Sequence, residues 1–572
     1  MLETKVISSL GKIFTYEVLN GKNIPSKILN NEPFSFQVAF RLCDSELYVE
    51  PVYIKIESDL PDNTICVYKQ GYVPVFNTYI NGYSDIAEGK NSGLYPDPLF
   101  KRNINSKAIP TVYNSCFRVV EEDERYPIAA TTSAYQGLWV TLNENGDKLS
   151  YGKHFITLKF YSAADNTFIT EENVELEVLN ASLDEQQLKY TSWFHADCIA
   201  DIYDVEIFSD RHFEIMRSFI EEAVKAGMNM ILIPAFTPPL DTMVNGERKT
   251  AQLIKVKKNG EKYEFDFSLF EKYIKLCVEC GIQYFEHSHL FSQWGAEHAP
   301  KIVAEIDGNL HKIFGWETDS KSEEYSDFLN QYFPKLITVL EKLGIKDKIY
   351  FHISDEPSEE HFENYKNASR VLREIYPEIK TFDALSKYKF YKSGAVDVPI
   401  VMTDSEDMCN FVDNCPEFWA YYTGGNLNAG CPNRLISLPS GRNRRLGIQL
   451  YVANAKGFLH WGYNFYYDVL SKGVINPFEN PCNYNASPGT SFVVYPAANG
   501  KAIPSIRMKV MLEAINDYRA LKTLERLIGR EETLKIVLSI CKNAKFTDAI
   551  SDEEIIKLRE EVNKLIYTSC NQ

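Results

Sequence analysis

Between residues 188 and about 528, short apolar segments alternate with amphipathic helical patterns. Apolar runs of about four to eight residues between turn signals are typical of buried strands, and an apolar period of about 3.6 residues is typical of helices. The predicted strands are 188–195, 228–235, 282–289, 348–354, 380–386, 399–405, 416–423 and 457–465, and the predicted helices include 210–226, 266–280, 323–343, 359–375 and 441–455. Eight strands with crossover helices predict a (β/α)8 TIM-like barrel over residues 184–528.

The first 183 residues follow a different pattern. Segments such as SFQVAF (35–40), FITLKF (155–160) and VELEVL (174–179) alternate in polarity or nearly so, and turn-rich stretches separate them. This pattern predicts a β-sandwich domain over residues 1–183. The sequence of residues 529–572 has the pattern of charged surface helices. This pattern predicts a short helical C-terminal extension packed on the barrel. The expected fold class is therefore α/β with an all-β N-terminal module.

Charge and composition narrow the classes of function. The formal net charge of −17 argues against a nucleic-acid ligand and against adsorption to an anionic membrane. No apolar run approaches the roughly 18 residues of a membrane span, and the first residues show no secretory leader, so we expect a cytoplasmic protein. The 12 cysteines show no disulfide or zinc spacing, and Cys277 and Cys280 form a lone C-x-x-C inside a predicted helix. Aromatic residues make up 13% of the chain, which fits either sugar-stacking platforms or a tyrosine-rich core.

Two adjacent acids, Asp355 and Glu356, end the fourth predicted strand in the segment FHISDEP. Reacting groups of barrel enzymes lie at the carboxyl ends of strands. Neighbouring strand residues face opposite sides, so both acids can share a pocket only where the strand curls out, and Pro357 supplies such an ending. The alternative is that the acids are solvated at the start of the next helix.

The spacing of this pair favours one kind of chemistry. Ordinary retaining glycosidases use two carboxyl groups about 5 Å apart across the sugar, which adjacent residues do not readily straddle. Adjacent acids can serve when the substrate supplies its own nucleophile, the 2-acetamido carbonyl of an N-acetylhexosamine. One acid then polarises the amide N–H and stabilises an oxazolinium ion, and the other protonates the leaving oxygen. Repulsion between the two helps to keep that second acid protonated.

Three ordered blocks carry a resemblance to a known family. They are FHISDEP, the segment 416–467 that contains FWAYYTGGN and FLHWGYNFY, and the segment 489–521 that contains SIRMKVMLEAINDYRAL. Together, over roughly residues 190 to 525, they resemble glycoside hydrolase family 123, exo-acting β-N-acetylgalactosaminidases that act on glycosphingolipid-type glycans. The resemblance implies that Asp355 orients and stabilises the acetamido group and that Glu356 is the general acid and then the base. It implies no cofactor and no metal.

Further residues are candidates for binding the sugar. They lie late in predicted strands or in the loops that follow, where rings can stack on a sugar and polar groups can bind hydroxyls. The candidate substrate-binding residues are His195, Asp197, Trp419, Tyr421, Arg434, Trp461 and Tyr463. The expected partner is an oligosaccharide or a glycolipid glycan with a terminal β-linked N-acetylgalactosamine.

Two other functions remain open at this point. A divalent-metal-dependent barrel hydrolase could use His195, Asp197, His287, His289 and His352 with Asp355 as ligands, although no H-E-x-x-H motif is present. A non-catalytic sugar-binding protein would keep the aromatic residues without needing the paired acids. The sequence distinguishes neither N-acetylgalactosamine from N-acetylglucosamine nor the aglycone, the oligomeric state or the role of the sandwich.

Overall fold

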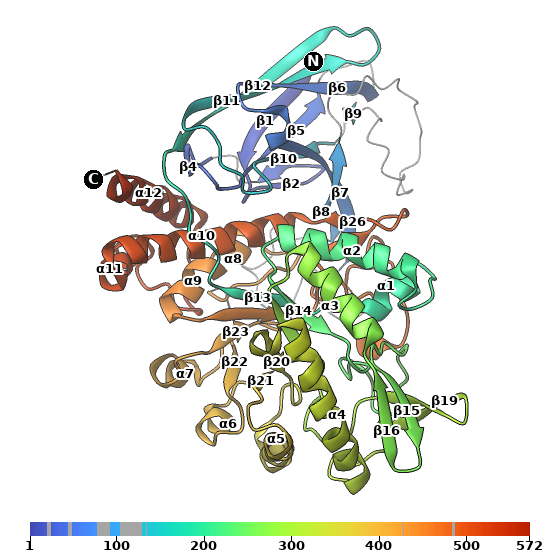
Figure 1. Cartoon of the computed structure of the whole chain (residues 1–572). Helices are drawn as coiled ribbons and strands as arrows, with labels where there is room; N and C mark the ends of the chain where they lie inside the picture. The colour runs from blue at the N-terminus through green and yellow to red at the C-terminus, as the bar shows by residue number, and fades with distance from the viewer. Residues whose placement is uncertain are drawn as a thin grey trace.

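The computed structural model describes residues 1–19, 24–43, 49–76, 92–102, 128–132, 134–426, 428, 430–482 and 487–571. Its N-terminal β-rich part lies above the long helix α10 (Ile506–Ile528), and the parallel strands of the second part lie below that helix (Figure 1). The expected α/β class with an all-β N-terminal module is therefore found.

The N-terminal part consists of two five-stranded sheets that share one core. Apolar residues alternate along the central strands, as in Phe36, Val38 and Phe40 facing Ile156 and Leu158, and these side chains fill the space between the sheets. The first sheet has the order β1 (Leu2–Ser8), β5 (Phe34–Leu42), β10 (Gln136–Leu142), β7 (Ile65–Val75) and β8 (Gly93–Arg102). The second has the order β4 (Lys27–Leu29), β12 (Phe168–Leu179), β11 (Gly152–Ser162), β6 (Val49–Ser58) and β9 (Ile128–Thr131). A short pair, β2 (Lys12–Ile13) and β3 (Val18–Leu19), lies beside them, and one 3-10 turn spans Asp62–Thr64.

Each of the eight predicted parallel strands has a counterpart, shorter than expected. Five form one parallel sheet in the order β13 (Lys189–Ser192), β24 (Gly457–His460), β23 (Trp419–Tyr421), β22 (Val398–Met402) and β21 (Phe382–Ala384). Three form another in the order β14 (Met230–Ile233), β17 (Tyr284–His287) and β20 (Ile349–Phe351).

The two parallel sheets are arcs that touch at both ends. A parallel bridge joins Phe351 to Thr381 at one end. At the other, Asn229 N–H donates to the Tyr190 carbonyl (3.1 Å), and the Asn229 amide oxygen accepts from Tyr190 N–H (2.8 Å). The described strands do not form one continuous ladder, because several are only three residues long, so the closed (β/α)8 barrel stays a prediction.

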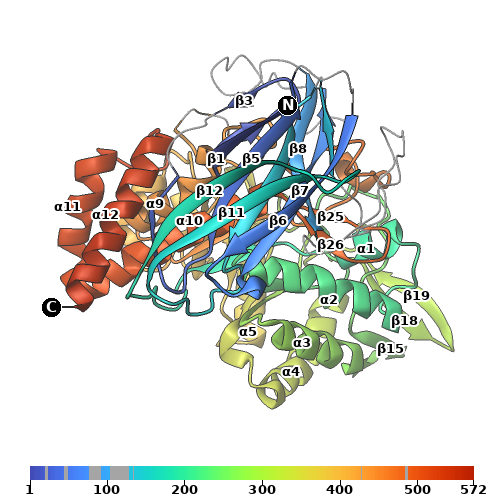
Figure 2. The same ribbon diagram turned by 90° about the horizontal axis from the view of Figure 1, so that it is seen from above.

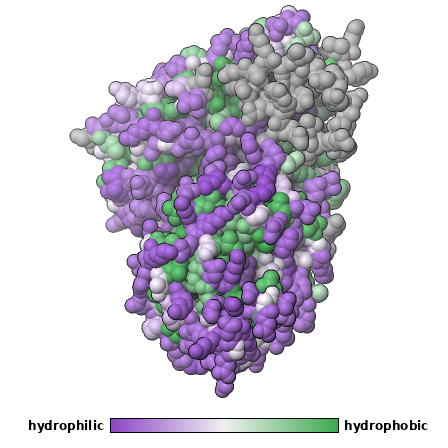
Figure 3. Space-filling view, turned by 45° about the vertical axis from the view of Figure 1, so that its right-hand side comes forward, coloured by the Kyte–Doolittle hydropathy of each residue, from purple (hydrophilic) through white to green (hydrophobic). Residues whose placement is uncertain are grey.

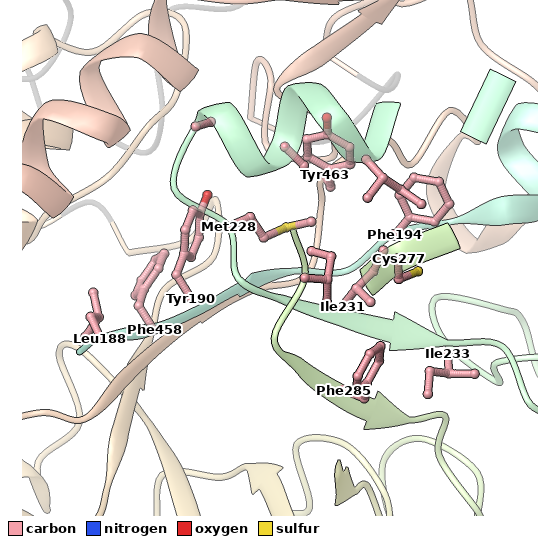
Figure 4. Packing of buried hydrophobic residues seen from close by; sticks show 14 of the residues in the cluster. Leu188, Tyr190, Phe194, Met228, Ile231, Ile233, Cys277, Phe285, Phe458 and Tyr463 are labelled. Atoms are coloured by element: carbon pink, nitrogen blue, oxygen red, sulfur yellow. The ribbon is translucent and has the colours of Figure 1, made fainter. Parts of the chain in front are cut away.

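Alternation along these short strands separates an inner from an outer core. Met230, Leu232 and Trp419 belong to the inner apolar cluster, while Ile231 and Ile233 belong to the outer one. Figure 4 shows outer-core side chains such as Ile231, Phe285 and Tyr463 close to one another, with a helix lying over them. Apart from Lys189, Tyr284 and Met402, which are half-buried, every residue of these parallel strands is buried.

The helices agree closely with the predicted ones. The expected helices 210–226, 266–280, 323–343 and 359–375 are found as α2 (Asp210–Lys225), α3 (Ser268–Cys280), α4 (Glu323–Leu343) and α5 (Phe362–Ile375), and 441–455 is divided into α8 (Ser440–Arg444) and α9 (Leu446–Ala453). The remaining helices are α1 (Ala196–Ile202), α6 (Tyr388–Lys392), α7 (Met408–Asn414), α11 (Arg530–Cys541) and α12 (Asp552–Cys570), with 3-10 turns at Lys346–Lys348, Glu359–His361 and Val469–Ser471.

Two further sets of strands were not expected. A four-stranded sheet is built from β15 (Lys255–Asn259), β16 (Lys262–Asp266), β18 (Ile302–Ile306) and β19 (Asn309–Phe314), and a small pair from β25 (Val494–Pro496) and β26 (Ala502–Pro504). The first set comes from insertions that follow β14 and β17 at the end of the strands where the site lies.

The N-terminal sandwich packs against helix α10. Arg507 donates to both carboxylate oxygens of Asp97 in β8 (2.9 and 2.8 Å), and Lys509 pairs with Glu144. All four side chains are largely buried in this interface. Helix α12 joins the contact from the other side, since Arg559 pairs with Glu32 (2.8 Å). Seen from above, the sandwich strands cross over α10, with α11 and α12 together at one end (Figure 2).

The face in Figure 3 is mainly hydrophilic, with hydrophobic residues gathered toward the middle of the lower part. Among the described residues, no helix combines the length and the apolar character that crossing a bilayer requires.

Candidate active site

A cavity of about 170 Å³ lies at the carboxyl ends of the parallel strands. Its lining comes from the ends of β13, β21, β23 and β24 and from the loops after β14, β17 and β20. The lining residues are Trp193, His195, Leu240, Asp241, Gln293, Trp294, Asp355, Glu356, Ala384, Tyr421, Thr423, Leu459 and Trp461. No described residue of 1–183 is among them.

Asp355 and Glu356 both reach this cavity because the chain leaves the sheet before them. Strand β20 ends at Phe351, and Glu356 has φ of 44°, a left-handed conformation that is uncommon outside glycine. Its N–H donates to the Ala384 carbonyl (3.0 Å), which fixes the turn. The turn, rather than Pro357 alone, brings two successive side chains to one wall.

Neighbouring residues orient each carboxyl group. Gln293 Nε2 donates to Asp355 Oδ2 (2.8 Å), while Gln293 Oε1 accepts from the backbone N–H of Asp241 (2.8 Å). The Tyr421 hydroxyl donates to Glu356 Oε1 (2.8 Å). One oxygen of each acid therefore has a fixed partner, and no side chain in the described part of the chain donates to the other oxygen.

The electrostatics favour retention of a proton on this pair. Burial raises the pKa of Asp355 well above its usual range, and the neighbouring charge of Glu356 raises it further. Burial also raises the pKa of Glu356, although the hydrogen bond from Tyr421 opposes this shift. Two acids in which one stays protonated near neutral pH can supply both a proton and a hydrogen-bond acceptor.

His195 belongs to the wall, but it has no free nitrogen. Its Nε2 donates to the Trp461 carbonyl (3.0 Å) and its Nδ1 accepts from Arg248 (2.9 Å). Burial, and then the charge of Arg248, lower the pKa of His195 to about 3, so the ring is neutral. Asp197 lies behind it and pairs with Arg248, in contrast to the predicted contact with a sugar.

Three other predicted binding residues lie outside the cavity lining. Trp419 is fully buried in the inner core, where Phe382 packs edge-on against its ring (5.5 Å). Arg434 is buried and donates to the Ser192 hydroxyl (3.2 Å) and the Gly462 carbonyl (2.5 Å). The Tyr463 hydroxyl donates to a carbonyl of α2 (2.7 Å), on the outer side of the strands (Figure 4). These three residues hold the fold together; of the predicted substrate-binding residues, Tyr421, Trp461 and His195 line the cavity.

Several lining residues were not predicted from the sequence. Trp193 directly follows β13, and Asp241, Gln293 and Trp294 lie in long irregular loops. The only signal available was their place after predicted strands, where many polar residues stand without a role. Trp294 is 40% exposed and has φ of 58°. Its N–H donates to the Asp355 carbonyl (2.9 Å).

The metal hypothesis can be tested on the buried group formed by His289, His352 and Asp383. Their potential ligand atoms lie within 4.8 Å of one another. The two imidazole rings, however, stack with centroids 4.1 Å apart and planes only 10° from parallel. A ring nitrogen binds a metal in the plane of its ring, so one ion cannot lie in both planes. Both nitrogens of His352 are also hydrogen-bonded to carboxylates, Asp383 and Glu286 (3.0 Å each). This geometry does not fit a single metal ion.

Comparison with known proteins agrees with the cavity chemistry. The model of the glycoside hydrolase 123 catalytic domain matches residues 193–524. No curated protein matches the chain. A solved family 123 glycoside hydrolase from Clostridium perfringens, described as acting on glycolipid glycans, is similar in fold with a TM-score of 0.72 at 16% identity, covering 100% of this chain and 98% of that one. A GH10 xylanase from termite gut has a TM-score of only 0.33 at 10% identity, covering 67% of this chain and 90% of that one.

The family match spans more than half of the chain and includes the strands, the loops and the acidic pair that form the cavity. The chain belongs to glycoside hydrolase family 123.

Proposed function

We propose that the protein is a retaining exo-glycosidase that removes terminal β-linked N-acetylgalactosamine from glycans such as those of glycosphingolipids. The observation that carries this proposal is the adjacent pair Asp355 and Glu356 in the lining of one cavity, both with raised pKa values. Two acids on one wall suit participation of the 2-acetamido group better than attack by an enzyme carboxylate from across the ring.

In the proposed reaction, the carboxyl groups of Asp355 and Glu356 have different roles. The acetamido carbonyl oxygen of the substrate attacks C1 while the bond from C1 to the leaving oxygen breaks. Glu356 gives its proton to that leaving oxygen, and Asp355 accepts the amide N–H and stabilises the positive oxazolinium ring. A water molecule then attacks C1 and gives a proton to Glu356, which regenerates the amide and retains the anomeric configuration.

The shape of the site supports exo action. We take the two parallel arcs as the halves of one (β/α)8 barrel, with the cavity at its carboxyl-terminal rim. A cavity of about 170 Å³ suits one sugar ring rather than a chain of them. The preference for the galacto configuration rests on the family resemblance.

A thiazoline analogue of the cyclic intermediate tests the mechanism directly. Derived from N-acetylgalactosamine, it should bind at least about 100-fold more tightly than the free sugar, as analogues of high-energy species do. Calorimetry on the wild-type protein gives both affinities, and a crystal soak should place the analogue beside Asp355. Equal affinity for the two ligands would remove the support for acetamido participation.

We further propose that Trp294 binds the first sugar of the leaving group. It is the most exposed tryptophan of the lining, and the hydrogen bond from its N–H to the Asp355 carbonyl ties its backbone to the acidic pair. Trp294→Ala should lower kcat/KM about tenfold for a disaccharide in which N-acetylgalactosamine is β-linked to a second sugar, because the stacking surface is lost.

Steady-state kinetics with two substrates separate this role from a structural one. The β-fluoride of N-acetylgalactosamine has no leaving sugar, so its kcat/KM should stay unchanged in Trp294→Ala. The matched variant Trp294→Phe keeps a ring and should retain most of the activity on the disaccharide. An equal loss on the fluoride and the disaccharide would instead mean that the substitution disturbs Asp355.

A further inference from the structure

A row of three charged groups lies beneath the acidic pair, within the inner core. Glu286 in β17, His352 after β20 and Asp383 in β21 are fully buried, and both ring nitrogens of His352 lie 3.0 Å from a carboxylate oxygen, Nε2 from Glu286 and Nδ1 from Asp383. Glu286, at one end of the row, has two further hydrogen-bond donors. Trp193 Nε1 (2.9 Å) and the Thr191 hydroxyl donate to Glu286.

The geometry fixes the charge of the central residue. Asp383 also accepts from the N–H groups of Ile353 and Ser354, and Glu286 also accepts from Trp193, as ionised carboxylates do. A ring that contacts a carboxylate through each nitrogen carries a proton on both. Burial alone lowers the pKa of His352, but the hydrogen bonds and charges of Asp383 and Glu286 outweigh it and raise that pKa to about 9. His352 is therefore an imidazolium ion at neutral pH.

The row also holds the backbone that carries the acidic pair. The Asp383 carboxylate accepts the N–H groups of Ile353 (3.1 Å) and Ser354 (3.3 Å), two residues that follow the end of β20. The hydroxyl of Tyr365 donates to the same carboxylate (2.6 Å). Side-chain oxygens of Asp383 thus take the place of backbone carbonyls as acceptors for the N–H groups of residues 353 and 354.

Among the charged groups around Asp355, His352 is the one that carries a positive charge and acts on it. Its own segment contributes Glu356 and His352, β21 contributes Asp383, and the loop after β14 contributes Asp241 on the cavity wall. From the β17 side, His289 stacks on His352 and is kept neutral by burial and by the charge of His352, while Glu286 stays paired to His352. Arg248 is committed to Asp197, and the charge of His352 acts on Asp355 in the direction of the ionised form.

We propose that His352 is a positioning residue of the reaction: as the cation of the Glu286–His352–Asp383 row, it fixes the segment that carries Asp355 and Glu356 and favours the ionised form of Asp355. The catalytic part of this inference rests on the proposed function, whereas the charge of the row does not. Loss of the cation should leave Asp355 protonated over a wider range of pH, and a protonated Asp355 cannot accept the amide N–H of the substrate.

The test is His352→Gln in the full-length protein. Without the cation, the pKa of Asp355 rises, so the acidic limb of kcat/KM should move to higher pH by about one unit. At neutral pH, kcat should fall at least about tenfold, with a smaller change in KM. The matched control is His287→Gln. His287 is a second buried histidine, in β17, and it contacts the Ser288 carbonyl and the Tyr332 hydroxyl (2.7 Å each). That control should lower the melting temperature but leave the pH profile in place.

A second measurement covers the case in which His352→Gln does not fold. Nitrogen NMR of histidine-labelled wild-type protein should show one buried histidine that keeps protons on both ring nitrogens up to about pH 8. A neutral His352 at pH 7, or an unchanged acidic limb in folded His352→Gln, would overturn the proposal. If the wild-type protein hydrolyses no N-acetylhexosaminide, the proposed function fails while the NMR result still decides the charge of the row.

Discussion

Glu356→Gln should lower kcat by about 10²- to 10⁴-fold on an oligosaccharide substrate, because the leaving oxygen no longer receives a proton. Gln keeps the shape of the side chain and can still accept the hydrogen bond from Tyr421. Binding of N-acetylgalactosamine should therefore change little. The loss should be smaller for a nitrophenyl glycoside, whose leaving group needs less protonation. Initial rates on both substrates and calorimetry with the sugar measure these effects.

The control for this variant is Glu359→Gln, an exposed acid three residues further along the chain. It should retain wild-type kinetics, since it does not line the cavity. The same pair of variants separates an enzyme from a sugar-binding protein that does not catalyse hydrolysis. Turnover by Glu356→Gln at the wild-type rate on the oligosaccharide would show that Glu356 is not the acid.

The 2-acetamido group should decide whether a substrate is hydrolysed at all. We expect the wild-type protein to release nitrophenol from the β-glycoside of N-acetylgalactosamine at least about 10³-fold faster than from the β-galactoside, which differs only at C2. The galactoside lacks the internal nucleophile. A well-oriented nucleophile within the substrate reacts much faster than one that arrives as a separate molecule. Comparison of kcat/KM for the two glycosides is the measurement.

The β-glycoside of N-acetylglucosamine is the matched control, because it keeps the acetamido group and inverts only the hydroxyl at C4. Its rate relative to the galacto compound reports the configuration that the cavity prefers. Rapid hydrolysis of the β-galactoside would contradict acetamido participation, whatever the ratio between the two acetamido sugars.

The order of strands and helices could be predicted because it depends on local periodicity. Helices such as α4 (Glu323–Leu343) have one apolar face and end in a residue suited to a left-handed C-cap, Gly344, so their bounds were close to those found. The four-stranded insertion could not be predicted in the same way. Strand β19 (Asn309–Phe314) is largely exposed, and its sequence NLHKIF does not alternate regularly between polar and apolar residues.

The site was predictable only where chemistry and position coincided. Asp355 and Glu356 are two acids at the end of a buried strand. Burying such a pair lowers the stability of the fold, so its presence indicates a function. Alternation along a strand indicates the side that a residue faces, but not its depth in the barrel. Trp419 therefore shares a strand face with Tyr421 and yet lies in the inner core rather than in the cavity. Gln293 and Trp294 come from irregular loops, whose course depends on contacts distant in sequence.

The Asp97–Arg507 pair has a consequence for how such a chain could be divided or recombined. Loss of the Asp97 carboxylate would leave Arg507 buried without its acid, although the carbonyls of Gly489 and Phe492 would still accept from it, and truncating one partner of a buried pair typically costs about 3–5 kcal/mol. The N-terminal part is therefore not an interchangeable module like a tethered binding domain. A chimera with a foreign sandwich would have to bring its own acid to the same place.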